Sequence, residues 1–128
     1  MKRIVFPLFI GLAGCPGFGS QRLGNGLINR VPECPTYEEH ISLIMDAYCV
    51  TCHGEVSITD SLSYQFDRYA GPTGVFENAE AIQQACESTT NPMPPSGMTP
   101  LDAVELDTLA LWIEQGKAET AADVEGCR

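Results

Sequence analysis

The chain has 128 residues, which suffice for one domain and not comfortably for two, and its 44% hydrophobic and 19% charged residues favour a folded protein. A formal net charge of −10 excludes a nucleic-acid backbone as the partner, because few basic side chains are available to neutralise phosphates. No apolar run approaches the roughly 20 residues of a membrane span, whereas six cysteines indicate export or a bound prosthetic group.

The first fourteen residues have the order of a secretory signal. Positively charged residues 1–3 precede an apolar stretch at 4–12, and small residues then lead to Cys15. A buried strand or helix beginning at Ile4 is the alternative, and it leaves this order unexplained. The ending Leu-Ala-Gly-Cys resembles the lipobox of bacterial lipoproteins, which implies that Cys15 carries a lipid. We therefore expect residues 1–14 to be a lipoprotein signal peptide and the exported domain to be anchored at the bacterial cell envelope, in the periplasm or outside the membrane.

The next segment is poor in signals of regular structure. Four glycines and two prolines within residues 16–33 indicate a flexible membrane tether at 15–33. The folded domain is expected at 34–128. A domain of this size buries only about two-thirds of its surface, so a large apolar cofactor would help to fill its core.

The first predicted helix begins at the capping box formed by Thr36 and Glu39 and runs directly into Cys49. The residues of its apolar face follow helical spacing: Tyr37, Ile41, Ile44, Met45 and Tyr48. The polar segment at 55–73 that follows the cysteine has no clear period and is expected to be a loop.

Two further helices complete an all-α fold. The second covers Glu77–Cys86, where apolar residues recur on one helical face. The third is expected to begin at Thr99 as the N-cap, with Pro100 in the first helical position, and to end at Gly116 as the glycine after the last turn.

The candidate chemistry lies at residues 49–53, with the sequence Cys-Val-Thr-Cys-His. C-x-x-C-H is the attachment motif of haem c, because Cys49 and Cys52 can reach the two vinyl groups of one haem while His53 supplies an imidazole to the iron. A thioredoxin-like site would need a βαβ context, and a zinc site would need two more ligands at paired spacing. A disulfide between the two cysteines would leave the histidine without a role.

The sixth iron position has four candidate residues. Met93 stands between prolines that restrict its backbone, and Met98 follows a flexible stretch on the same segment. Met45 lies on the apolar face of the first helix and is expected to be core packing. His40 is expected to face solvent.

Taken together, this order of helix, Cys-x-x-Cys-His, loop, helix, Met-Pro-Pro and a helix containing Trp112 and Ile113 resembles a class I, single-haem cytochrome c on a bacterial lipoprotein. The resemblance covers about Pro35–Gly116. It implies a small helical fold wrapped round one covalent haem c, with Met93 as the distal iron ligand and Met98 as the alternative. The long tether and the extra cysteines depart from the family pattern.

The function implied is electron transfer by iron cycling between ferric and ferrous states, and not an enzymatic reaction. The implied partners are redox proteins with basic docking surfaces, which the acidic charge would attract. The alternative is a five-coordinate haem protein that acts as a peroxidase or a small-gas sensor.

Three cysteines remain after the lipid and the haem are assigned. Cys86 lies on the apolar face of a helix, where a free thiol behaves as a small hydrophobe. Cys34 and Cys127 flank the domain, and chain ends often lie close together, so we expect these two to form a disulfide.

Overall fold

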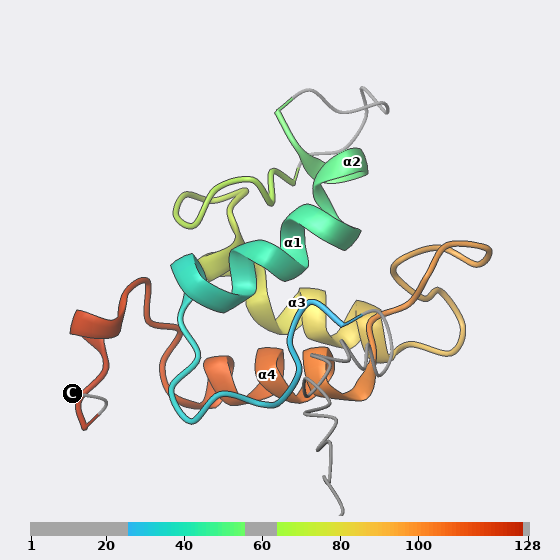
Figure 1. Ribbon diagram of the computed structural model, residues 1–128. Coiled ribbons are helices and arrows are strands. Elements are labelled where there is room, and N and C mark those ends of the chain that lie inside the picture. The colour runs from blue at the N-terminus through green and yellow to red at the C-terminus, as the bar shows by residue number, and fades with distance from the viewer. Residues whose placement is uncertain (1–25, 56–63, 127–128) are drawn as a thin grey trace, which may run out of the picture.

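The computed structural model describes residues 26–55 and 64–126, and every regular element in these two ranges is a helix (Figure 1). The elements in chain order are η1 (Tyr37–Ile41), α1 (Ser42–Tyr48), α2 (Val50–His53), α3 (Val75–Glu87), α4 (Ala103–Glu114) and η2 (Ala121–Asp123). The all-α class predicted from the sequence is therefore confirmed for the described part of the chain. The signal peptide expected at 1–14, the lipid expected on Cys15 and the proposed disulfide partner Cys127 lie outside it.

The first helix begins at Thr36, as the capping box predicts, but the second hydrogen bond of the box is made by a different residue from the one expected. The Thr36 hydroxyl accepts the backbone N–H of Glu39 at 3.3 Å. The Thr36 N–H donates to the Nδ1 atom of His40 at 3.2 Å, in place of the expected Glu39 carboxylate. His40 is consequently half-buried, and its ring serves the N-terminus of the helix.

The first helix is divided into three short pieces. Its first turn is wide, because the N–H of Ile41 reaches back five residues to the Thr36 carbonyl at 3.1 Å. From Ser42 the spacing becomes α-helical and continues to Tyr48. Cys49 interrupts the helix with a φ of −118°, and α2 follows. The predicted run of the helix into the cysteine motif is thus confirmed, with a break at the first cysteine.

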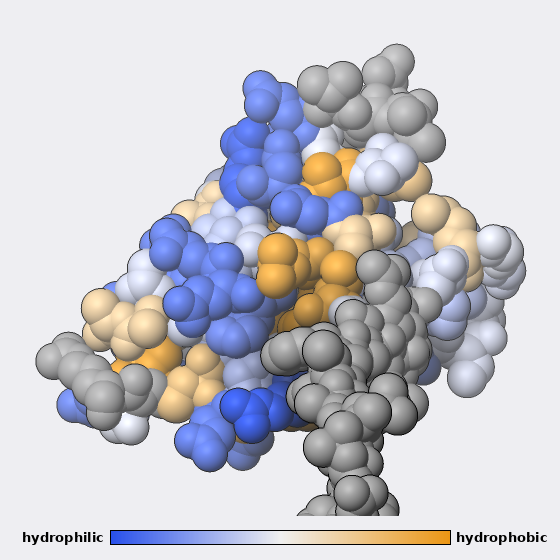
Figure 2. Space-filling model, in the orientation of Figure 1, coloured by the Kyte–Doolittle hydropathy of each residue, from blue (hydrophilic) through white to orange (hydrophobic). Residues whose placement is uncertain are grey.

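The core lies where the first helix meets α3 and α4, and α4 contacts both η1 and α3. The fully buried apolar side chains are Ile41, Ile44, Met45, Val75, Ala79, Leu109 and Trp112. The expectation that Met45 is core packing is therefore confirmed. Ile28 also belongs to this core, so packing against the domain begins before the boundary expected at Cys34. On the face shown in Figure 2, apolar surface over α1 and α2 lies beside strongly hydrophilic surface.

The start of α4 corrects one prediction. The helix is capped by Asp102 and not by Thr99, which lies three residues earlier, outside any helix. The Asp102 side chain accepts the N–H of Glu105 at 2.9 Å, and the Glu105 carboxylate accepts the N–H of Asp102 at 2.8 Å. This reciprocal pair satisfies two N–H groups at the start of the helix at once. The predicted terminal glycine is confirmed, because Gly116 has a φ of +93°.

The segment after α4 returns to the beginning of the first helix. The Ala118 carbonyl accepts the N–H of Tyr37 at 2.9 Å and the indole Nε1–H of Trp112 at 2.9 Å. The N–H of Glu38 donates to the Glu119 carbonyl at 3.0 Å. Two residues near the C-terminal end therefore supply acceptors to N–H groups that the first turn of a helix leaves without partners.

Candidate functional site

The short helix α2 places the cysteine motif. Its backbone is held by hydrogen bonds from the N–H groups of Cys52 and His53 to the Cys49 carbonyl, at 3.0 and 2.8 Å. Gly54 ends the turn, and a β-carbon there would lie 2.7 Å from the Val50 carbonyl oxygen. Only glycine therefore allows the chain to leave the helix so close to it.

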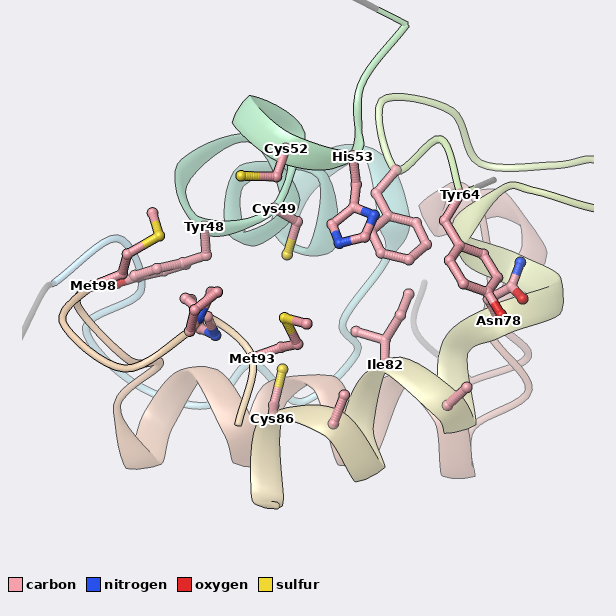
Figure 3. A pocket seen from close by; sticks show the side chains of 15 residues that line it. Tyr48, Cys49, Cys52, His53, Tyr64, Asn78, Ile82, Cys86, Met93 and Met98 are labelled. Atoms are coloured by element: carbon pink, nitrogen blue, oxygen red, sulfur yellow. The ribbon is translucent and has the colours of Figure 1, made fainter. Parts of the chain in front are cut away.

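An apolar cavity of about 400 Å³ lies beside α2 (Figure 3). Its walls come from the cysteine motif, the loop after it, α3 and the loop between α3 and α4. The lining residues are Tyr48, Cys49, Cys52, His53, Tyr64, Phe66, Asn78, Ala81, Ile82, Ala85, Cys86, Met93, Pro94, Pro95 and Met98. The volume falls within the range of about 300–1,000 Å³ that is typical of small-molecule and cofactor sites.

His53 is held in this cavity by aromatic neighbours. Its ring lies 4.9 Å from the Phe66 ring and 6.3 Å from the Tyr64 ring, measured between centroids. The N–H of Phe66 donates to the His53 carbonyl at 2.6 Å and so ties the loop to the motif. Burial lowers the pKa of His53, which favours the neutral imidazole that metals bind. Its buried Nδ1 atom has no hydrogen-bond partner among the described residues.

Three thiols line the same cavity. Cys49, Cys52 and Cys86 are present as thiols, so the first two are not joined in a disulfide. Burial, followed by the neighbouring Cys86 and Cys52, raises the pKa of Cys49 to about 12. Burial also raises the pKa of Cys86 to about 11, with a smaller contribution from Glu87. The protonated form of both groups is therefore strongly favoured near neutral pH.

Both candidate methionines reach the cavity from the loop between α3 and α4. Figure 3 shows Met93 pointing into it near Cys49 and Cys86, while Met98 lies at its edge beside Tyr48. The N–H of Met93 donates to the Ala85 carbonyl at 2.9 Å, which fastens this part of the loop to α3. The two methionines remain 43% and 47% exposed, so they stand where the cavity opens to the surface.

The structure separates these methionines from the other two ligand candidates. Met45 is wholly buried in the core. His40 lines a different, polar hollow formed with residues 27–33. The cavity thus contains both cysteines and the histidine of the motif, together with Met93 and Met98.

Several lining residues were not predicted from the sequence to belong to the site. Asn78, Ile82 and Cys86 stand four residues apart on α3 and form one stripe along the cavity wall. Their spacing in the sequence predicts that the three residues share one face of a helix. Only the fold shows that this face lies opposite the cysteine motif. Tyr48 was expected as a core residue and also lines the cavity.

Cys34 is disulfide-bonded, and its partner lies outside the described residues. In residues 26–55 and 64–126 no group of three or more His, Cys, Asp and Glu side chains is arranged to hold a metal ion. The helices of this part of the chain are all too short or too polar to cross a membrane.

In comparisons with known proteins, no protein-family model, no curated protein and no solved structure matches the chain. The function must therefore be argued from the chemistry of the cavity.

Proposed function

We propose that the protein is a single-haem c-type cytochrome that carries one electron at a time. Haem c would be attached through Cys49 and Cys52, with His53 as the proximal iron ligand and Met93 as the distal one. The observation that supports this most strongly is that one apolar cavity contains all four of these side chains. The cysteine motif predicts the first three from the sequence alone, and the cavity adds a thioether sulfur from a distant segment.

The residues present fit such a group. A porphyrin requires an apolar enclosure, and this cavity is lined mainly by aliphatic and aromatic side chains. Covalent attachment requires two thiols on one short turn, which α2 provides with Cys52 and the preceding Cys49. Iron ligation requires a neutral imidazole, and burial favours that form of His53.

Haem c, when bound, supplies an iron that accepts and releases one electron. The chain's own residues set how readily this happens. A soft thioether such as that of Met93 favours ferrous iron and raises the reduction potential. The apolar walls exclude water, while the exposed edge at the methionines leaves a short route to a partner protein.

The cellular setting is part of the proposal. The lipid at Cys15 would anchor an exported protein to the membrane of the bacterial cell envelope. Its partners would be redox proteins with basic docking surfaces, because the net charge of −10 attracts them at long range. Nucleic acid is not among the proposed partners.

Haem staining after denaturing electrophoresis tests the proposal. The mature wild-type protein should retain the stain, and a Cys49→Ala, Cys52→Ala double variant should lose it. Cys86→Ala is the matched control, because it removes a thiol from the same cavity but leaves the motif intact. Persistent covalent haem in the double variant, or no haem in the wild type, would contradict the assignment.

A further inference from the structure

Glu105 is a carboxylate in an unusual place. It lies in the first turn of α4 and none of it is exposed to solvent. Within residues 26–55 and 64–126 it forms no ion pair with a basic side chain. A buried charge without a counter-ion is costly, so its surroundings must compensate by other means.

Hydrogen bonds provide that compensation. One carboxylate oxygen, Oε1, accepts the hydroxyl of Tyr48 at 2.9 Å. The other, Oε2, accepts the backbone N–H of Asp102 at 2.8 Å. The partial positive charge at the N-terminus of α4 adds a further favourable interaction with an anion.

Tyr48 connects this carboxylate to the candidate site. Its side chain lines the cavity, and its residue directly precedes Cys49. The cavity wall is therefore hydrogen-bonded, through one phenol, to a buried acidic group on α4. The capping role of Glu105 accounts for the bond to Asp102 but not for the bond to Tyr48.

We propose that the Glu105 carboxylate acts as a fixed negative charge that lowers the reduction potential of a haem in this cavity. The inference rests on the proposed function. When a mediator donates one electron, ferric iron becomes ferrous and the site loses one positive charge. A nearby anion stabilises the more positive ferric state, so it opposes this reduction. Because the carboxylate is buried, water and salt screen the effect only weakly.

Glu105→Gln is the principal test variant. Glutamine is as acceptable as glutamate at this position of a capping box, so the helix start should be preserved. In a spectroelectrochemical titration with a mediator, the variant's ferric-to-ferrous ratio at a fixed electrode potential should fall about tenfold, which equals a rise of about 59 mV for one electron. Glu105→Met, which removes the charge while keeping a similar length, should shift the ratio in the same direction.

A matched variant separates the buried charge from an exposed one. Asp107→Asn removes an exposed carboxylate from the same helix. It should change the ratio less than threefold. The inference is wrong if Glu105→Gln also stays within threefold of the wild type, or if Asp107→Asn reproduces its shift. Absence of covalent haem from the wild-type protein would instead overturn the proposed function, and this inference with it.

Discussion

Single substitutions can decide whether Met93 or Met98 is the distal iron ligand of the proposed haem. Met93 points into the cavity and its N–H is fastened to α3, whereas Met98 lies at the cavity's edge. Met93→Ala should remove the weak sulfur-to-iron band near the red end of the ferric spectrum and lower the reduction potential. Met98→Ala should leave both unchanged. The opposite result would assign the ligand to Met98, and a wild-type spectrum without the band would favour the five-coordinate alternative.

Cys86 should be an unreactive thiol in the native protein. Burial raises its pKa from 9.0 to about 11, so the thiolate fraction at pH 8 falls on the order of 100-fold. Alkylation of the Cys86 peptide by iodoacetamide, followed by mass spectrometry, should be slower by about that factor than in denatured protein, and should accelerate as the pH approaches 11. Because the folded state holds this proton more tightly, the group stabilises the fold below about pH 9 and loses that contribution as the pH rises through 11. Equal rates in native and denatured protein would contradict the assigned burial.

Residues adjacent in sequence were the easiest part of the site to predict. Cys49, Cys52 and His53 share a motif whose spacing alone predicts common chemistry, and the structure places all three on one cavity. Cys86 was predicted to be a small apolar packing residue, because its helical face does not reveal what packs against it. His40 was expected to face solvent, but its ring accepts a hydrogen bond from the Thr36 N–H. Helix propensity does not predict this bond, because the bond depends on the local backbone geometry of the first turn.

At the level of helices, the start of α4 offers a direct comparison between two capping candidates. Asp102→Ala should destabilise the protein by about 1 kcal/mol, because it removes the acceptor for the Glu105 N–H. Thr99→Ala should change the free energy of unfolding by less than about 0.5 kcal/mol, since it lies upstream of the helix. Denaturant unfolding followed by circular dichroism measures both. Equal losses in the two variants would indicate that the helix begins earlier than described.

All three predicted helices are present, because their apolar residues recur with helical spacing over two turns or more. Their ends were less predictable. Thr99 and Asp102 are both good N-cap residues, and each is followed three positions later by an acidic residue, so the local pattern alone does not distinguish them. The helix at Val75–Glu87 begins two residues before the expected Glu77. Its first residue, Val75, is buried and lies between the predicted loop at 55–73 and the predicted helix start.

At the scale of the whole molecule, the identity of the cysteine bonded to Cys34 can be tested. Cys34 is bonded, and Cys49, Cys52 and Cys86 are thiols, which leaves Cys15 and Cys127 as partners. Because the sulfur of Cys15 is expected to carry the lipid, we predict a bridge to Cys127 that closes almost the whole domain. A loop of that length contributes on the order of 4 kcal/mol in the chain-entropy treatment. Non-reducing peptide mapping should recover the Cys34 and Cys127 peptides as one species that separates after reduction. Recovery of Cys34 linked to any other cysteine would refute this pairing.

The carbonyl groups of Ala118 and Glu119 also bear on the order in which the chain folds, because they complete the hydrogen bonds of the first helix. They accept hydrogen bonds from the N–H groups of Tyr37 and Glu38. The first helix can therefore acquire these partners only when the chain up to residue 119 is present in the same compartment. Contacts separated by about eighty residues form late, because a long loop must close before they contribute. Under the proposed export from the N-terminus, the helix that carries the cysteine motif would cross the membrane before these acceptors do. We therefore expect the interval between the two events to leave Cys49 and Cys52 accessible for the proposed attachment of haem c.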